Sequence, residues 1–236
     1  PIGGYVTLCN NRCLLRKGDG MEIDMMKEPD VMVYLMTGFL DSGKTQFLNF
    51  TLSQDYFQID GKTLLILCEE GEEEYDPREL LKYGVVIETV EDKEDLTEEW
   101  LEEMNKKHKP ERVVIEYNGM WQVSEFEKMK LPAGWAIEQK ITTVDASTFQ
   151  MYLTNLKPLF VEMVKGAELV LFNRCEDKKP LAGYRRSVKV VSPQAEVIFE
   201  DENGEVDNIF EDEVPYDLKA PVIEIPREDY GIWYID

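Results

Sequence analysis

Histidine and cysteine are scarce in this chain, which has one His and four Cys among 236 residues. Four thiols do not make a disulfide framework at this length, so we expect a cytoplasmic protein with reduced cysteines. Cys9 and Cys13 lack the second cysteine pair or nearby histidine that would complete a zinc site. The sole histidine, His108, lies among lysines, where we expect it to be solvated.

Basic residues are also few: 26 Lys and Arg oppose 48 Asp and Glu, which gives a net charge of −22. Nucleic-acid and anionic-lipid surfaces both require clustered positive charge, so we expect neither as a partner. No apolar run approaches the roughly 18 residues that would span a bilayer, and the first residues lack the pattern of a signal peptide. The hydrophobic fraction of 43% is nevertheless typical of a chain with a globular core.

A phosphate-binding loop is present at Gly38-Phe-Leu-Asp-Ser-Gly-Lys-Thr45, which matches the pattern G-x-x-x-x-G-K-[ST]. Glycines let the backbone wrap so that successive N–H groups point at phosphates. Lys44 can reach the β- and γ-phosphates, and Thr45 offers a hydroxyl to Mg²⁺. The residues expected to contact the nucleotide here are Gly38, Asp41, Ser42, Gly43, Lys44 and Thr45. The loop therefore predicts a nucleoside triphosphate site.

Strands and helices alternate from residue 31 onward. Strand-like runs lie at 31–36, 63–68, 85–89, 112–115, 141–144, 168–172 and 195–199. Several are almost continuously apolar, which is typical of parallel strands covered on both faces. Helices are expected at 44–52, from Asp95 to His108, and from Ala146 to Val164 with an interruption near Pro158. This alternation predicts an α/β fold with a doubly wound, mostly parallel, three-layer Rossmann-like sheet of the P-loop NTPase type.

The composition changes at both ends of the chain. Residues 1–28 are interpreted as a β extension with a hairpin turn at Asn10 and Asn11, because Asn tolerates the positive φ of such turns. Residues 201–236 hold 12 acidic and 2 basic side chains and are interpreted as an acidic extension with a short strand at 222–225. We therefore expect the P-loop domain to occupy residues 29–200.

A candidate metal ligand ends the strand-like run before residue 117. Glu116 can place Mg²⁺ together with Thr45, directly or through water. Gly119 follows three residues later and would let the backbone approach the γ-phosphate. The alternative is an ordinary strand that ends in a charged residue.

A candidate base-recognition loop follows the run at 168–172. It contains Asn173, Arg174 and Glu176. A carboxylate at the last position can accept hydrogen bonds from guanine N–H groups that adenine does not have, which favours GTP over ATP. The Arg174 stem could cover the base. The alternative is a solvated loop.

An acidic segment from Cys68 to Asp76 follows the second predicted strand. It is either a solvated loop or a switch segment that responds to the γ-phosphate and the metal. In the second case Glu69, Glu72 or Asp76 would orient the attacking water, and Lys44 and Glu116 would complete the catalytic set.

In this order, these segments resemble the CobW-like family of P-loop GTPases, which includes metal-insertion and metal-chaperone proteins. The family motifs G-F-L-G-S-G-K-T, N-E-x-G, E-x-x-G, V-D-A, N-K-x-D and N-P-x-A correspond to segments that begin at Gly38, Cys68, Glu116, Val144, Asn173 and Ser192. The resemblance covers about residues 31–200. It implies a guanine nucleotide with Mg²⁺, a homodimer that forms with GTP, and a client protein.

Two family features are missing. The C-x-C-C metal motif should precede the E-x-x-G segment, but residues 85–112 contain no cysteine, and the family's C-terminal domain is not recognisable in residues 201–236. We interpret Cys68 and Cys175 as small buried hydrophobic residues. The resemblance therefore implies GTP and Mg²⁺ more strongly than delivery of Zn²⁺ or another divalent metal.

The leading hypothesis from the sequence is a GTP-binding protein with slow, Mg²⁺-dependent GTPase activity. Lys44 and the loop N–H groups would stabilise charge on the phosphoryl oxygens, and no arginine finger is evident. One alternative is an ATP-dependent small-molecule kinase, which shares the P-loop. The other is a nucleotide-binding adaptor with little hydrolysis, whose acidic segments serve as a partner surface.

Overall fold

The computed structural model describes residues 29–69, 71 and 74–206. The expected hairpin at Asn10 and Asn11, the candidate Glu72 and the expected strand at 222–225 fall outside these residues. Within the described part of the chain, no helix is long and apolar enough to cross a membrane.

The described strands form one sheet with the order β3-β2-β4-β1-β5-β6-β7-β8. Their bounds are β1 Val31–Thr37, β2 Thr63–Leu67, β3 Val85–Thr89, β4 Arg112–Glu116, β5 Trp135–Asp145, β6 Leu169–Asn173, β7 Glu196–Asp201 and β8 Gly204–Glu205. All neighbours pair in parallel except β7 and β8, which are antiparallel. Because β1 lies between β4 and β5, the loop that follows it stands at the centre of the sheet edge.

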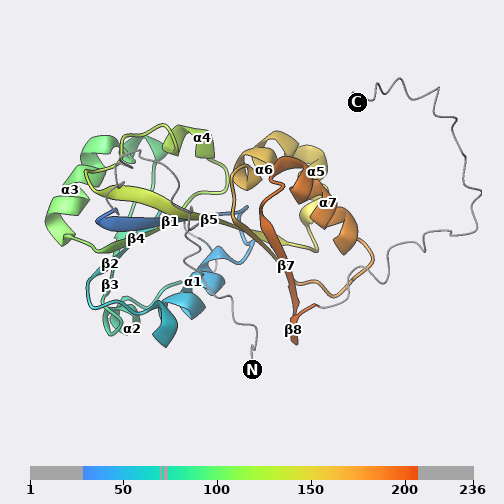
Figure 1. Ribbon diagram of the computed structural model, residues 1–236, viewed down its shortest axis with the longest axis horizontal. Coiled ribbons are helices and arrows are strands. Elements are labelled where there is room, and N and C mark those ends of the chain that lie inside the picture. Colours follow the sequence, from blue (N-terminus) through green and yellow to red (C-terminus); the bar gives the residue numbers. More distant parts are fainter. Residues whose placement is uncertain (1–28, 70, 72–73, 207–236) are drawn as a thin grey trace, which may run out of the picture.

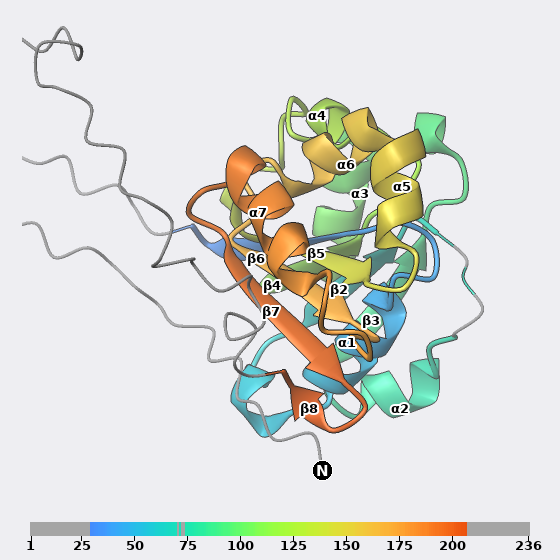
Figure 2. The same ribbon diagram turned by 90° about the vertical axis from the view of Figure 1, so that its right-hand side faces the viewer.

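The helices cover both faces of this sheet (Figure 1). Their bounds are α1 Lys44–Leu52, α2 Pro77–Leu81, α3 Glu98–His108, α4 Val123–Phe126, α5 Phe149–Asn155, α6 Lys157–Val164 and α7 Leu181–Val191. The helices α1 and α2 lie on one face, and α3 to α7 lie on the other. Figure 2 shows the same separation from the side. The predicted doubly wound, mostly parallel three-layer fold is confirmed.

Element boundaries differ most from the predictions at three places, and the other predicted strands shift by at most two residues. The helix expected from Asp95 starts at Glu98, because Thr97 caps it by accepting a hydrogen bond from the Trp100 N–H at 3.1 Å. The helix expected over 146–164 is two helices, and Pro158 lies in the first turn of the second. The strand expected at 141–144 begins six residues earlier, at Trp135.

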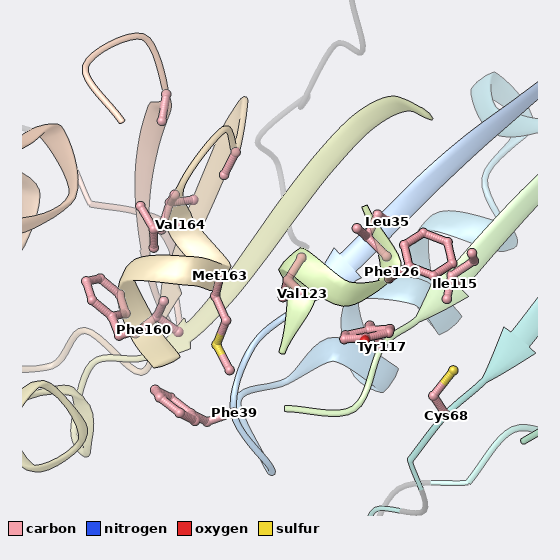
Figure 3. Packing of buried hydrophobic residues seen from close by; sticks show 14 of the residues in the cluster. Leu35, Phe39, Cys68, Ile115, Tyr117, Val123, Phe126, Phe160, Met163 and Val164 are labelled. Atoms are coloured by element: carbon pink, nitrogen blue, oxygen red, sulfur yellow. The ribbon is translucent and has the colours of Figure 1, made fainter. Parts of the chain in front are cut away.

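The core has two apolar clusters, one on each face of the sheet. Alternate residues of β1 enter different clusters: Val33 and Leu35 face α3 to α7, whereas Met36 packs under α1 with Leu48. Figure 3 shows Leu35, Ile115 and Phe126 packed together in the first cluster. This two-sided burial explains why β1 and β2 consist almost entirely of apolar residues.

Candidate nucleotide-binding site

The phosphate-binding loop follows the carboxyl end of β1. Gly38 has a φ of 145° and Gly43 a φ of 91°, which are conformations that glycine adopts readily and other residues do not. A Cβ on Gly38 would lie 2.5 Å from both Ser42 Oγ and the carbonyl oxygen of Thr143. These two glycines allow the loop to turn tightly against β5 before α1 begins at Lys44.

Lys44 is buried, with only 3% of its side chain exposed. Its ammonium donates hydrogen bonds to the carbonyl oxygens of Gly38 at 3.0 Å and Phe39 at 2.9 Å. Its third partner is the Glu69 carboxylate, whose Oε2 lies 2.5 Å from Nζ. An ammonium has three N–H donors, so the lysine is fully hydrogen-bonded and held across the loop.

Thr45 and Glu116 come together although 71 positions separate them in the chain. The Thr45 hydroxyl donates to Glu116 Oε1 at 2.7 Å, and the Tyr75 hydroxyl donates to Glu116 Oε2 at 2.5 Å. Burial raises the pKa of Glu116, and the two hydroxyl donors and the nearby Lys44 ammonium oppose this effect.

This pair of oxygen ligands fits Mg²⁺. In phosphate sites Mg²⁺ is usually bound through one or two protein oxygens, and phosphate oxygens and water complete its octahedron. A transition metal would need more protein ligands, but no group of three or more His, Cys, Asp or Glu suited to a metal occurs in the described residues.

The segment from Glu116 to Gly119 packs directly on the phosphate-binding loop. A Cβ on Gly119 would lie 2.4 Å from the carbonyl oxygen of Gly38 and 2.8 Å from the Cα of Phe39. The Gly119 N–H donates to Glu69 Oε1 at 3.2 Å. The glycine expected to approach the γ-phosphate thus also permits close contact between two loops.

The loop after β6 also touches the phosphate-binding loop. The Asn173 side-chain N–H donates to the carbonyl oxygen of Ser42 at 2.8 Å, and its Oδ1 is buried without a partner in the described protein. Glu176 and Arg174 line a cavity of about 430 Å³ that continues beneath α1. An orphaned acceptor and a carboxylate therefore border a space next to the phosphate-binding loop.

Arg174 links three parts of the site rather than extending into solvent. Its Nη1 lies 3.0 Å from the Asp41 carbonyl oxygen and 2.5 Å from Asp145 Oδ2. Asp145 also accepts hydrogen bonds from Ser147, and together these donors outweigh the effect of burial and lower the pKa of Asp145. The guanidinium therefore ties the phosphate-binding loop to the ends of β5 and β6.

Asp41 and Arg174 both adopt the left-handed conformation, with φ values of 58° and 53°. Aspartate tolerates this region better than most residues, which explains why Asp41 can replace the glycine found in the family's loop.

Most of the predicted phosphate residues meet at one cleft of about 110 Å³. Its lining includes Asp41, Gly43, Lys44, Thr45, Glu69 and Glu116. Asp76 does not line this cleft: its Oδ1 accepts hydrogen bonds from the N–H groups of Arg78 at 2.9 Å and Glu79 at 3.3 Å, which caps α2. Of the acidic candidates for orienting water, the structure places Glu69 at the cleft.

Sequence reasoning did not single out three side chains that support the site. Tyr75 donates a hydrogen bond to Glu116. The hydroxyl oxygen of Thr143 lies 2.9 Å from Ser42 Oγ, and Asp145 forms an ion pair with Arg174. The available signals were weak: an aromatic residue within an acidic run, a hydroxyl in a buried strand, and the middle residue of the V-D-A motif.

The two described cysteines are buried, as expected. Burial raises the pKa of the Cys68 thiol, and it raises the pKa of Cys175 to about 12. Both thiols are therefore protonated at neutral pH, whereas metals bind the thiolate.

A family profile shows to which protein family the chain belongs. The profile described as "CobW/HypB/UreG, nucleotide-binding domain" matches residues 32–199. The chain belongs to this family. The resemblance to CobW-like P-loop proteins that the sequence motifs indicated is thereby confirmed.

Two solved structures show the same fold. The hydrogenase maturation factor HypB from Archaeoglobus fulgidus aligns with a TM-score of 0.54 at 17% identity, over 75% of this chain and 84% of that chain. The Zn(II)-bound YjiA GTPase from E. coli aligns with a TM-score of 0.54 at 23% identity, over 75% of this chain and 59% of that chain. The match thus spans less than two thirds of YjiA. No curated protein sequence matches the chain significantly.

Proposed function

We propose that this CobW/HypB/UreG-family domain binds GTP with Mg²⁺ and hydrolyses it slowly. The observation that carries the proposal is the meeting of Lys44, Thr45 and Glu116 at one cleft, since these are the residue types that a P-loop enzyme needs around its phosphates. The oxygen pair of Thr45 and Glu116 would hold Mg²⁺, which neutralises phosphate charge when bound.

The residues of the cleft have distinct roles in this proposal. Lys44 stabilises charge that develops on the phosphoryl oxygens, and Glu69 is the acidic side chain at the cleft that would orient water after a triphosphate has displaced it from Lys44. Slow turnover follows from the lack of a free arginine: the one arginine that lines the cleft in the described chain, Arg174, is bound to Asp41 and Asp145.

Guanine recognition is assigned to the loop after β6. Glu176 supplies a carboxylate to accept the guanine N–H groups, and the unpartnered Asn173 Oδ1 is a second acceptor at the same cavity. If ATP displaced GTP from the purified protein, the kinase alternative would replace this assignment.

Substitution of Lys44 tests the proposal. Lys44→Ala removes the buried ammonium, so we expect GTP hydrolysis to fall by roughly 10²- to 10³-fold, as when one preorganised donor to a transition state is lost. Lys62→Ala, which removes an exposed lysine, is the matched control. Unchanged GTP binding and hydrolysis in Lys44→Ala would contradict the proposal, and GTP binding by the native protein without phosphate release would favour the adaptor alternative.

Metal delivery, a client protein and pairing of two copies across the nucleotide remain secondary proposals. YjiA has been solved with Zn(II), whereas the described residues of this chain lack a cluster that would hold such an ion. Calorimetric titration with Zn²⁺, with and without GTP, would reveal coupled binding if a transition metal is carried.

A further inference from the structure

The Glu69 carboxylate bridges two donors that face the phosphate cleft. Its Oε2 lies 2.5 Å from Lys44 Nζ, and its Oε1 accepts the Gly119 N–H at 3.2 Å. Only 9% of the Glu69 side chain is exposed. A buried carboxylate is thus held between the phosphate-binding loop and the loop after β4, the two loops whose donors would bind an anionic ligand.

We propose that Glu69 is a specificity-determining residue, whose carboxylate takes the place of the γ-phosphate until a nucleoside triphosphate displaces it. A nucleoside diphosphate can bind while Glu69 stays in position, whereas a triphosphate cannot. This inference rests on the proposed function, because it concerns the same guanine-nucleotide site.

The sheet order places Glu69 at the γ-phosphate end of the site. The base loop of Asn173 to Glu176 follows β6, on one side of β1, whereas Glu69 follows β2 and Gly119 follows β4 on the other side. A nucleotide whose base lies at the β6 loop crosses the phosphate-binding loop toward β4. Its terminal phosphate would therefore lie at the position that the Glu69 carboxylate occupies between Lys44 and Gly119.

Counting the donors of Lys44 leads to the same conclusion. The carbonyl oxygens of Gly38 and Phe39 take two of its three N–H groups, which leaves one for an anion. That one is directed at Glu69. A γ-phosphoryl oxygen can accept this hydrogen bond only after the carboxylate has moved away, whereas a diphosphate binds to the N–H groups of the loop without it.

The burial of Lys44 explains why an anion is needed beside its ammonium when no nucleotide is bound. An ammonium as buried as that of Lys44 is strongly destabilised when its counter-charge is removed. Glu69 supplies that charge, and the γ-phosphate supplies it in the triphosphate complex, so one anion exchanges for another. The apparent affinity for the triphosphate is lowered by the fraction of molecules in which Glu69 is in place.

Replacement of Glu69 separates the two nucleotides. The measurement is calorimetric affinity for GDP and for a non-hydrolysable GTP analogue with Mg²⁺, in the native protein, Glu69→Gln and Glu69→Ala. Both variants should shift the affinity ratio toward the triphosphate by about tenfold, which corresponds to about 1.4 kcal/mol. Glu74→Gln removes the same charge from an exposed position in the same segment and should leave the ratio unchanged.

Three outcomes would overturn the inference alone: an unchanged ratio in both Glu69 variants, a shift toward GDP, or an equal shift in Glu74→Gln. Either Glu69 variant is sufficient if the other does not fold, as judged by its circular dichroism. If the native protein binds neither guanine nucleotide, the proposed function fails and this inference fails with it.

Discussion

At the scale of single residues, close backbone contact decides which positions tolerate a side chain. Gly119 does not have an unusual φ, yet its missing Cβ is what allows the segment after β4 to rest on the phosphate-binding loop. The E-x-x-G motif therefore has a steric requirement in addition to any contact with a nucleotide.

Gly119→Ala should push the two loops apart. Its methyl group would meet backbone atoms, which cannot move aside as a flexible side chain can, so we expect a loss of roughly 1–3 kcal/mol in unfolding free energy and weaker GTP binding. Denaturant unfolding and calorimetry measure both effects. Gly183→Ala, where a Cβ meets nothing closer than 3.8 Å, is the control, and equal losses in the two variants would refute the steric account.

Several residues that local sequence patterns single out lie together in the structure. Local patterns that mark strand ends and turns singled out Asp41, Gly43, Lys44, Thr45 and Glu116, and the structure places all five at one cleft. Tyr75 escaped prediction because its role depends on a contact with a residue 41 positions away. Such a contact leaves no local pattern in the chain.

At the scale of elements, helix ends follow capping chemistry more closely than hydrophobic pattern. The apolar spacing of Leu96, Trp100 and Met104 favours a helix from Asp95, but Thr97 interrupts it and caps α3. The first half of β5 was not predicted, because the polar residues Glu138, Gln139 and Lys140 are not typical of a buried strand. A local pattern thus gives the existence of an element better than its bounds.

Thr97→Ala tests the cap of α3. Loss of the hydrogen bond to the Trp100 N–H should cost about 1 kcal/mol of unfolding free energy. Thr148 occupies the N-cap position of α5 without a side-chain capping bond, so Thr148→Ala is the matched control and should cost less. Equal midpoints for native protein and Thr97→Ala in denaturant unfolding would show that the cap contributes nothing.

At the scale of the whole molecule, the acidic chain depends on a few well-placed cations. Arg174 joins Asp145 at the end of β5 to the phosphate-binding loop that follows β1. Because hydrogen bonds lower the pKa of Asp145 in the folded state, this carboxylate stabilises the fold above the pKa of an unfolded aspartate, roughly 3.9. That contribution is lost as the pH falls through the folded-state pKa.

Asp145→Asn should therefore be less stable than the native protein at pH 7, by about 1–2 kcal/mol, as expected for hydrogen bonds to a charged group. The difference should begin to shrink as the pH falls below about 4, where the unfolded aspartate takes up a proton, and it should vanish below the lowered pKa of Asp145 in the folded protein. Urea unfolding at pH 7, 4 and 3 measures it. Asp92→Asn, at an exposed position without a side-chain capping bond, should show no such trend; a difference for Asp145→Asn that does not become smaller between pH 7 and pH 3 would contradict this prediction.

Short stretches of the sequence predict the α/β class, the phosphate-binding loop, the strand-end carboxylate Glu116 and the family resemblance, because each of these is marked by residues close together in the chain. Which loops meet cannot be predicted from such stretches. The sheet order brings the ends of β2 and β4 to one side of β1 and the end of β6 to the other. That order sets Glu69 against Lys44 and Gly119, and Arg174 against Asp41 and Asp145. These contacts join residues that are tens of positions apart in the chain. They depend on which strands pack side by side, and no local pattern encodes that order.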